Sequence, residues 1–417
     1  MELNRVVVTG IGIISPLGNN LDEFWNNLVN GVSGAGHITL YDASKFKTRI
    51  ACEVKNFDPT AYLDKKEVRK MDRFTQFGLV ASDMAMADAG LNKDNINPDR
   101  VGVIFGSGIG GVQTFQQEVM DFARGEGNPR FSPFFIPKMI LDIASGQISI
   151  RHNLRGPNFA VVSACATSTN CIMEAYNLLR LNKADVILAG GSEAAVIEAG
   201  MGGFVSMKAL SERNDDPKTA SRPYDKDRDG FVMGEAGAIL VLETLKSAQA
   251  RGAKIYCEIA GTGATADAFH ITAPHPEGLG ALNVMKAALE DAEMKPEDID
   301  YINTHGTSTP LGDGAEVKAI LGVFGDHSYD LNISSTKSMT GHCLGAAGVV
   351  EAIACVMSVM HDIVPPTINH FTDDPEIDSK LNFTFNKAQK RTVRAALSNT
   401  FGFGGHNACV IVKKYVA

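Results

Sequence analysis

A single cysteine at the junction of two predicted elements is the first candidate for chemistry. Cys165 lies within VVSACATSTNCIMEAYNLLR, residues 161–180, where valines precede small residues and apolar residues then recur at helical spacing. This pattern predicts a strand that turns sharply into a helix, with Cys165 at the corner. Unpaired backbone N–H groups and the helix dipole favour negative charge at a helix N-terminus, so we predict a nucleophilic thiolate. The alternative is a small buried hydrophobe, which is the usual role of an unpaired cysteine.

Two histidines and a lysine lie in glycine-rich loops of the second half of the chain. His305 belongs to NTHGTSTPLGD, just after a predicted strand, and His342 belongs to STKSMTGHCLGAAG, which leads into a predicted helix. Sheets of α/β proteins bind ligands at the carboxyl ends of their strands, so both loops are expected at a site. Lys337 would add a positive charge there, although by itself it would be an ordinary solvated lysine. A cysteine, two imidazoles and an ammonium group indicate acyl-thioester chemistry, and we expect them to converge on one cavity.

Three other patterns predict no separate site. Residues 106–111, GSGIGG, fit a dinucleotide fingerprint, but no second strand ending in an acid follows about 20 residues later. Residues 225–236, DKDRDGFVMGEA, imitate a calcium loop, but the twelfth position is Ala236 and a strand follows, so we predict a turn. Neither His270 nor the two histidines above have a partner at metal-ligand spacing. We therefore expect neither a metal nor a cofactor.

Composition limits the class of protein. The 417 residues are 44% hydrophobic and 21% charged, which is typical of a globular protein with two core units. A net charge of −9 argues against a general nucleic-acid binder. Seven scattered cysteines indicate free thiols in a reducing compartment. The N-terminus lacks a signal-peptide pattern and no 18 apolar residues run together, so we expect a cytoplasmic protein without a membrane span.

The elements that must position the candidate residues alternate between strand and helix, and their order occurs twice. In the first half we predict strands at 4–10, 101–108, 184–193 and 236–243, helices at 21–28, 73–90, 112–123 and 140–152, and a loop at 125–139. In the second half, the segments 255–268, 281–294, 299–313 and 333–353 repeat this order, and 395–412 closes it as a hairpin. We predict an α/β protein of two repeated halves, 1–254 with the cysteine and 255–417 with the two histidines, whose sheets are covered by helices.

Four segments resemble the β-ketoacyl-[acyl-carrier-protein] synthases. They are SACATS, NTHGTSTPLGD, SSTKSMTGHCLGAAG and SNTFGFGGHNA, and the similarity runs from Arg5 to Lys413 in the same motif order. Within that family the chain is closest to the type II elongating condensing enzymes of bacterial fatty acid synthesis. The resemblance implies a thiolase-like fold of five layers, αβαβα, a homodimer, and an acidic acyl-carrier protein as partner.

The resemblance also implies roles for the candidate residues. Cys165 would accept the acyl group, and His305 and His342 would act on the malonyl group. Lys337 would support the two imidazoles, with Glu351 as its partner. The implied reaction is a decarboxylative Claisen condensation that lengthens a fatty acyl chain by two carbons and needs no metal or redox cofactor.

Further residues resemble family positions around the substrate. Phe403 resembles a gating phenylalanine, and Asp267 and His270 lie in a loop expected to move with that gate. Ile109 matches a position that bounds the fatty acyl pocket. Phe135 is expected to line the same pocket, from this chain or from the dimer mate.

Carrier docking is predicted from basic residues and the acidity of the partner. The candidates form one short stretch plus two positions that resemble the family's entrance: Lys66, Arg69, Lys70 and Arg73, with Arg130 and Lys208. The alternative is that these basic residues only face solvent and bind no partner.

Three other functions stay open on the sequence alone. A polyketide-type ketosynthase would use the same mechanism. A thiolase would carry a second cysteine where this chain has a second histidine. A non-catalytic chain-length factor would lack the nucleophile that Cys165 supplies.

Overall fold

The computed structural model of the chain describes residues 3–416. Its first half contains β1 (Val6–Ile14), α1 (Leu21–Val29), β2 (Gly36–His37), β3 (Ile50–Ala51), α2 (Lys65–Val68), α3 (Arg73–Asp88), β4 (Val101–Gly106), α4 (Val112–Arg124), α5 (Phe135–Met139), α6 (Ile143–His152), β5 (Asn158–Phe159), α7 (Thr167–Arg180), β6 (Val186–Glu193), α8 (Glu198–Ser206), β7 (Ala236–Thr244) and α9 (Leu245–Ala250). Its second half contains β8 (Cys257–Ala266), α10 (Leu279–Asp291), β9 (Tyr301–Asn303), α11 (Pro310–Phe324), β10 (Asn332–Ser334), α12 (Lys337–Thr340), α13 (Ala347–His361), β11 (Ile363–Val364), β12 (Gln389–Lys390), β13 (Ala395–Gly402) and β14 (His406–Lys413).

Ten strands form one mixed sheet that is built twice to the same plan. Their order is β10-β9-β13-β14-β8-β1-β7-β6-β4-β5. On one side, β1 and β6 run antiparallel to β7, and β4 and β5 continue parallel to β6. On the other side, β8 and β13 run antiparallel to β14, and β9 and β10 continue parallel to β13. The two half-sheets therefore share one topology, and they are joined where Val6–Val8 of β1 pair with β8.

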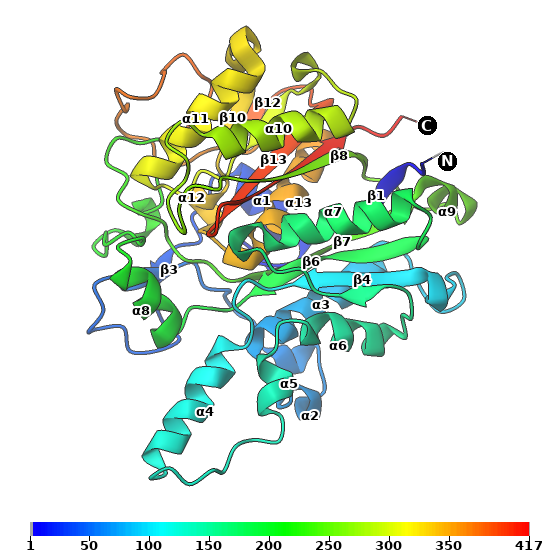
Figure 1. Cartoon of the computed structure of the whole chain (residues 1–417), viewed down its shortest axis with the longest axis vertical. Coiled ribbons are helices and arrows are strands. Elements are labelled where there is room, and N and C mark those ends of the chain that lie inside the picture. The colour runs from blue at the N-terminus through cyan, green and yellow to red at the C-terminus, as the bar shows by residue number, and fades with distance from the viewer. Residues whose placement is uncertain (1–2, 417) are drawn as a thin grey trace.

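Helices separate and cover the two half-sheets. α7 and α13 lie side by side between them, α3 and α6 cover the outer face of one half-sheet, and α10 and α11 cover the other (Figure 1). The layers follow one another as αβαβα. The predicted α/β fold with five thiolase-like layers is confirmed.

Glycines let the outer helices approach the strands closely. A Cβ added at Gly12 of β1 would lie 1.9 Å from the carbonyl oxygen of Ala81 in α3. A Cβ added at Gly263 of β8 would lie 2.4 Å from the carbonyl oxygen of Val284 in α10. Each half therefore uses the same device, because a side chain at either position would push the covering helix off its strand.

The central helix α13 is almost wholly apolar and buried. Its residues 347–359 are all buried, which is expected of a helix without a polar face. Within residues 3–416, Leu344–His361 is the one helical stretch long and apolar enough to cross a membrane, and 89% of it is buried inside the protein. Its one buried acid, Glu351, belongs to the site described below.

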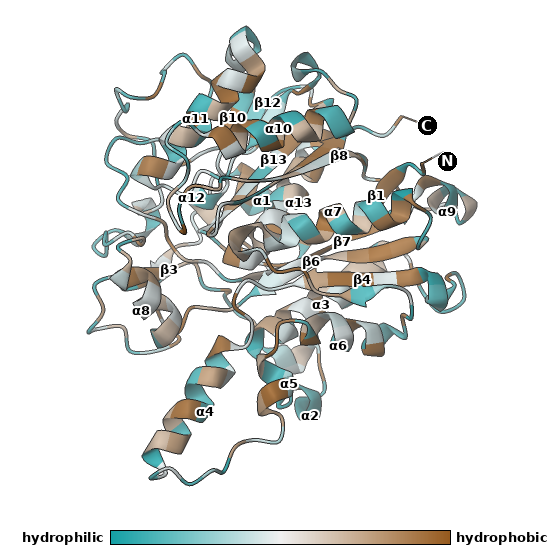
Figure 2. Ribbon diagram, viewed as in Figure 1, coloured by the Kyte–Doolittle hydropathy of each residue, from teal (hydrophilic) through white to brown (hydrophobic). Residues whose placement is uncertain are grey.

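One segment extends away from the layered body. Residues 112–139, called the arm here, comprise α4, a loop and α5, and they project from the body in Figure 1. Figure 2 shows hydrophobic residues along the arm as well as on the buried strands. Phe115, Phe122, Phe131 and Phe134 are each at least 38% exposed. The arm therefore presents apolar surface that no part of the described chain covers.

Two of the differences between the structure and the predicted elements lie before Cys165 and in the arm. The strand expected before Cys165 is only β5, and residues 160–163 are irregular because the chain leaves the sheet edge to reach the central helices. The predicted loop at 125–139 ends in the short helix α5. Pro137 lies in its first turn, where no backbone hydrogen bond is lost.

Candidate active site

Cys165 lies at the start of the central helix α7. It occupies a 3₁₀ turn, Ala164–Ala166, that leads directly into the helix. Ala164 has a φ of 52°, a left-handed conformation that costs a non-glycine residue about 1–2 kcal/mol. The second half repeats this arrangement at Leu344–Ala346, where Leu344 has a φ of 47° and α13 follows. The repeat therefore places two sharp turns together, one for each central helix.

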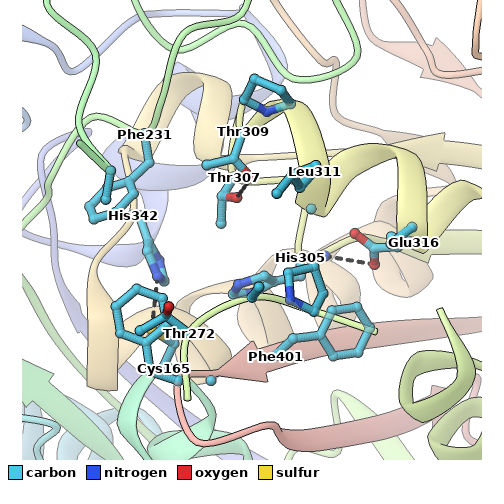
Figure 3. A pocket seen from close by; sticks show the side chains of 18 of the residues that line it. Cys165, Phe231, Thr272, His305, Thr307, Thr309, Leu311, Glu316, His342 and Phe401 are labelled. Carbon is cyan, nitrogen blue, oxygen red and sulfur yellow. Dashed lines mark hydrogen bonds between the residues drawn. The ribbon is translucent and has the colours of Figure 1, made fainter. Parts of the chain in front are cut away.

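The structure brings the cysteine and both histidines together. His342 Nε2 lies 3.0 Å from Cys165 Sγ, and the ring centroids of His305 and His342 are 5.2 Å apart and nearly perpendicular. The three side chains point toward one another into one cavity (Figure 3). The predicted convergence is found for these three side chains, whereas Lys337 does not line the cavity.

Aromatic rings and main-chain contacts fix the two imidazoles. The ring of Phe231 meets His342 edge-on at a centroid distance of 5.2 Å, and Phe401 lies 5.4 Å from His305. The N–H of His305 donates to Glu316 Oε1 at 2.9 Å (Figure 3). Sequence reasoning missed Phe231, Phe401 and Glu316, although a buried acid on α11 beside the histidine loop is a signal that could have been used.

Lys337 and Glu351 form a buried ion pair next to the imidazoles. The ammonium group of Lys337, on α12, donates to Glu351 Oε1, and both side chains are almost completely buried. Sequence reasoning identified both residues. A buried pair of this kind is costly to break from one side only, because the remaining charge loses its partner.

Burial keeps the reacting groups neutral at rest. It raises the pKa of the Cys165 thiol to about 12, and this outweighs the opposing effects of the Lys337 charge and the Phe403 N–H. Burial also lowers the pKa of His305 and of His342 well below the usual value, helped by the charge of Lys337. Burial therefore opposes the predicted resting thiolate, and His342 is the group placed to take the proton of the thiol.

One ring nitrogen of each imidazole makes no hydrogen bond to a described residue. Among the side chains that the structure describes, the buried Nδ1 atoms of His305 and His342 have no hydrogen-bond partner. No protein group of the described chain therefore fixes the tautomer of either ring.

The cavity that contains these groups has a volume of about 410 Å³. Phe403 and Asp267 line it, as the sequence predicts for a gate. His270 does not line it: the ring is exposed, and its Nδ1 accepts N–H groups of its own loop. Thr307 and Thr309, which sequence reasoning missed, also line the cavity, and their hydroxyl oxygens are 3.0 Å apart (Figure 3).

The predicted acyl-pocket residues lie elsewhere in this chain. Ile109 does not line the cavity of Cys165 but a second, apolar cavity of about 570 Å³ at the base of the arm. Phe135 lines neither cavity, and its ring stacks on Phe115 and Phe131 of the same arm. Within one chain, the structure therefore does not bring Phe135 to the substrate.

A buried carboxylate that sequence reasoning missed joins the two halves beside the cysteine. Glu193, at the end of β6, accepts N–H groups from Gly108 and Ile109 of the first half and from Gly345 of the second. The turn that follows His342 is thereby tied to the loop that carries Ile109. Gly345 must be glycine here, since an added Cβ would lie 2.3 Å from the backbone nitrogen of Gly108.

A thiol, two neutral imidazoles and a buried ammonium group at the junction of two repeated α/β halves define a thiolase-like acyl-transferring enzyme. The profile of the Beta-ketoacyl synthase N-terminal domain matches residues 3–248, and that of the C-terminal domain matches residues 256–371. The chain belongs to the β-ketoacyl synthase family.

Curated relatives and solved structures agree with this assignment. The chain is 50% identical over 416 residues to "3-oxoacyl-[acyl-carrier-protein] synthase 2" of Staphylococcus aureus strain N315, covering 99% of each chain. It is 49% identical to the protein of the same name from Synechocystis sp., covering 100% of this chain and 99% of the relative. It also resembles the structure of a type II PKS acyl-carrier protein in complex with its ketosynthase, with a TM-score of 0.91, 30% identity and coverage of 99% and 100%. The prediction of a ketoacyl synthase of the elongating, fatty acid type is confirmed.

Opposite charge effects on the thiol give a test of the ion pair. Lys337→Met removes a charge that lowers the pKa of Cys165, and it should slow alkylation of Cys165 by iodoacetamide about tenfold, the equivalent of about one pKa unit. Glu351→Gln removes a charge that raises the same pKa and should speed the reaction. The rate is measured at one alkaline pH from the mass of the Cys165 peptide. A change in the same direction for both variants would mean that the pair acts by holding structure and not by charge.

Proposed function

We propose that this chain condenses an acyl group held on Cys165 with the malonyl group of an acyl-carrier protein. The reaction is a decarboxylative Claisen condensation that yields a β-ketoacyl product two carbons longer. The observation that carries the proposal is the 3.0 Å contact between Cys165 Sγ and His342 Nε2, with the His305 ring on the same cavity. The names and full-length similarity of the curated relatives support the same reaction.

In the first half-reaction the acyl group moves to the cysteine. His342 Nε2 accepts the proton of the neutral Cys165 thiol as the sulfur attacks the thioester carbonyl. The bond between that carbonyl and the carrier's sulfur then breaks. His342 passes the proton to the departing sulfur, so the carrier leaves as a thiol. The backbone N–H groups of Cys165 and Phe403 hold the oxyanion, and each donor of this kind is worth about 3 kcal/mol. Gly402 leaves room for that oxygen, because an added Cβ would lie 3.1 Å from the backbone nitrogen of Cys165.

In the second half-reaction the malonyl group loses CO2. The electron pair of the broken carbon–carbon bond passes into an enolate, whose oxygen accepts hydrogen bonds from Nε2–H of His305 and His342. The enolate carbon then attacks the acyl carbonyl, and Cys165 leaves as a thiolate that takes up a proton. A ring whose tautomer is not fixed suits both steps, since His342 is an acceptor in the first and a donor in the second.

We propose fatty acyl groups rather than polyketides as substrates. The relatives at 49–50% identity are named 3-oxoacyl-[acyl-carrier-protein] synthase 2, whereas the polyketide ketosynthase structure is 30% identical. The apolar cavity beside Ile109 is the proposed site for the distal acyl chain, which would require this residue to move aside. Phe135 would reach that site only from a second copy of the chain.

The arm is the proposed dimer contact. Its exposed phenylalanines form an apolar surface of the kind that protein interfaces cover. The edge strand β5 lies nearby with an unpaired edge, and its Phe159 is exposed. A homodimer would cover both features.

We further propose a cytoplasmic location and a division of the chain at 254/255, in line with its two repeated halves.

The carrier protein is proposed to dock on basic residues in α2 and immediately after it. Lys66, Arg69 and Lys70 are exposed, and Lys70 Nζ lies 5.7 Å from the ring centroid of Phe134 on the arm. Arg73 is not available for docking, because its guanidinium makes two 3.0 Å hydrogen bonds to the buried carboxylate of Glu235.

Loss of the nucleophile separates the two half-reactions. Cys165→Gln should abolish condensation but leave release of CO2 from malonyl-carrier protein, because the two imidazoles that stabilise the enolate remain. The assay follows labelled CO2 and β-ketoacyl product in parallel, and His305→Ala serves as a comparison that should lose CO2 release as well. Condensation by the Cys165→Gln variant would refute the assigned nucleophile.

Charge reversal on α2 tests the docking surface. The double variant Lys66→Glu, Arg69→Glu should raise the KM for the carrier protein about tenfold, with an unchanged kcat, because complementary charges govern encounter with an acidic partner. The dependence of KM on salt should also become weak. Lys93→Glu, at an exposed lysine outside the helix, is the matched control. An unchanged KM in the double variant would discard this surface.

A further inference from the structure

The segment 225–230, which imitates a calcium loop in sequence, folds around the side chain of Arg228. The carboxylate of Asp225 accepts backbone N–H groups from Phe371, Thr372 and Asp227, so it is used within the protein. The guanidinium of Arg228 is 5% exposed. The residues that follow it in sequence, 229–231, line the cavity of Cys165. Arg228 therefore sits directly behind a wall of the active site.

The guanidinium of Arg228 donates hydrogen bonds to the loop that carries Thr307 and Thr309. Nε donates to the carbonyl oxygen of Thr309 at 3.2 Å, and Nη2 donates to that of Pro310 at 3.0 Å. Nη1 donates to the carbonyl oxygen of Asp225 at 2.9 Å and to Asp374 Oδ2 at 2.5 Å. One guanidinium thus joins three separate segments, in the planar, forked geometry that arginine provides and lysine does not.

The loop held in this way is strained. Ser308 has a φ of 67°, and its carbonyl oxygen and hydroxyl accept N–H groups from Gly230 and Arg222, both at 3.0 Å. The residues on either side of it, Thr307 and Thr309, turn their side chains to the cavity. By binding the carbonyl oxygens of this loop, Arg228 therefore also fixes the positions of the Thr307 and Thr309 hydroxyl groups in the cavity.

A second carboxylate lies near the guanidinium of Arg228, in addition to that of Asp374. Asp313, in the first turn of α11, has Oδ2 3.5 Å from Nε of Arg228 and accepts the N–H of Tyr224. Two carboxylates, those of Asp313 and Asp374, thus face one guanidinium, and removing the positive charge would leave them without compensation. A variant that keeps the charge is needed to test any role beyond folding.

We propose that Arg228 is a positioning residue for substrate binding, which holds the Thr307–Pro310 loop so that its two hydroxyls bind the thioester-bearing arm of the carrier protein. This inference rests on the proposed function. The hydroxyls are among the few polar groups on a largely apolar wall, and such convergent groups orient a ligand. Hydroxyls that bind the arm and not the reacting carbonyl would stabilise ground state and transition state alike, so their loss should appear in KM and not in kcat.

Two variants test this role. Arg228→Lys keeps the charge but loses the fork, and Asp374→Asn weakens the outer anchor of the guanidinium. Each should raise the KM for acyl-carrier protein, Arg228→Lys about tenfold, with kcat within about twofold of the wild type. Acylation of Cys165 by a short thioester of a simple thiol, which lacks the carrier's arm, should be unchanged. The matched control is Arg251→Lys, whose guanidinium is also mostly buried and pairs with Glu243 at 2.7 Å away from the cavity.

A double-mutant cycle separates positioning from folding. Thr309→Val alone should raise the same KM, and combining it with Arg228→Lys should add little, because both changes remove one interaction. An unchanged KM in both Arg228→Lys and Asp374→Asn, or fully additive effects with Thr309→Val, would overturn the inference. A wild-type enzyme that does not accept acyl-carrier protein would instead refute the proposed function, and the inference with it.

Discussion

The close packing of α7 against α13 between the two half-sheets is the constraint on which the site depends. Gly348 permits it, since an added Cβ would lie 2.0 Å from Thr169 Oγ1, and Ser168 Oγ accepts the N–H of Val349 at 3.0 Å. Each helix is entered through a left-handed residue and one 3₁₀ turn, at Ala164 and Leu344. Because the helices begin at the same point, Cys165 of one half meets His342 of the other.

Burial at that point has an electrostatic consequence. It makes the thiol and both imidazoles neutral, so the site stores no charge on the reacting atoms. The buried ionisable groups around the reacting atoms are Lys337 and Glu351, which pair with each other, and Glu193, which accepts backbone N–H groups. Charge then develops on substrate and sulfur only during reaction, where preorganised donors and the nearby ammonium group stabilise it. The same layer of buried polar groups also ties the two halves together.

Much of the fold and of the active site could be predicted from the sequence. The features that could not be predicted share a physical cause. The repeated order of strands and helices, the nucleophile and the two histidines were accessible because each lies in a local pattern of glycines and apolar residues. The pKa of the Cys165 thiol could not be predicted from the sequence, because segments far away in the chain bury the sulfur and raise that pKa. The roles of Glu193 and Arg228 were also hidden, since each acts on backbone groups far away in sequence. The position of Phe135 depends on an arm that extends from the body, which no local pattern encodes.

The central claim is that Cys165 carries the acyl group during turnover, activated by an imidazole from the opposite half. The most direct measurement is tandem mass spectrometry of the protein after incubation with an acyl-carrier protein in the absence of malonyl substrate. The account predicts the mass of one acyl group on the peptide that contains Cys165. It predicts unmodified peptides for the other six cysteines, which are not among the residues that line the cavity of the two histidines. An acyl group on another residue, or none on any peptide, would contradict it.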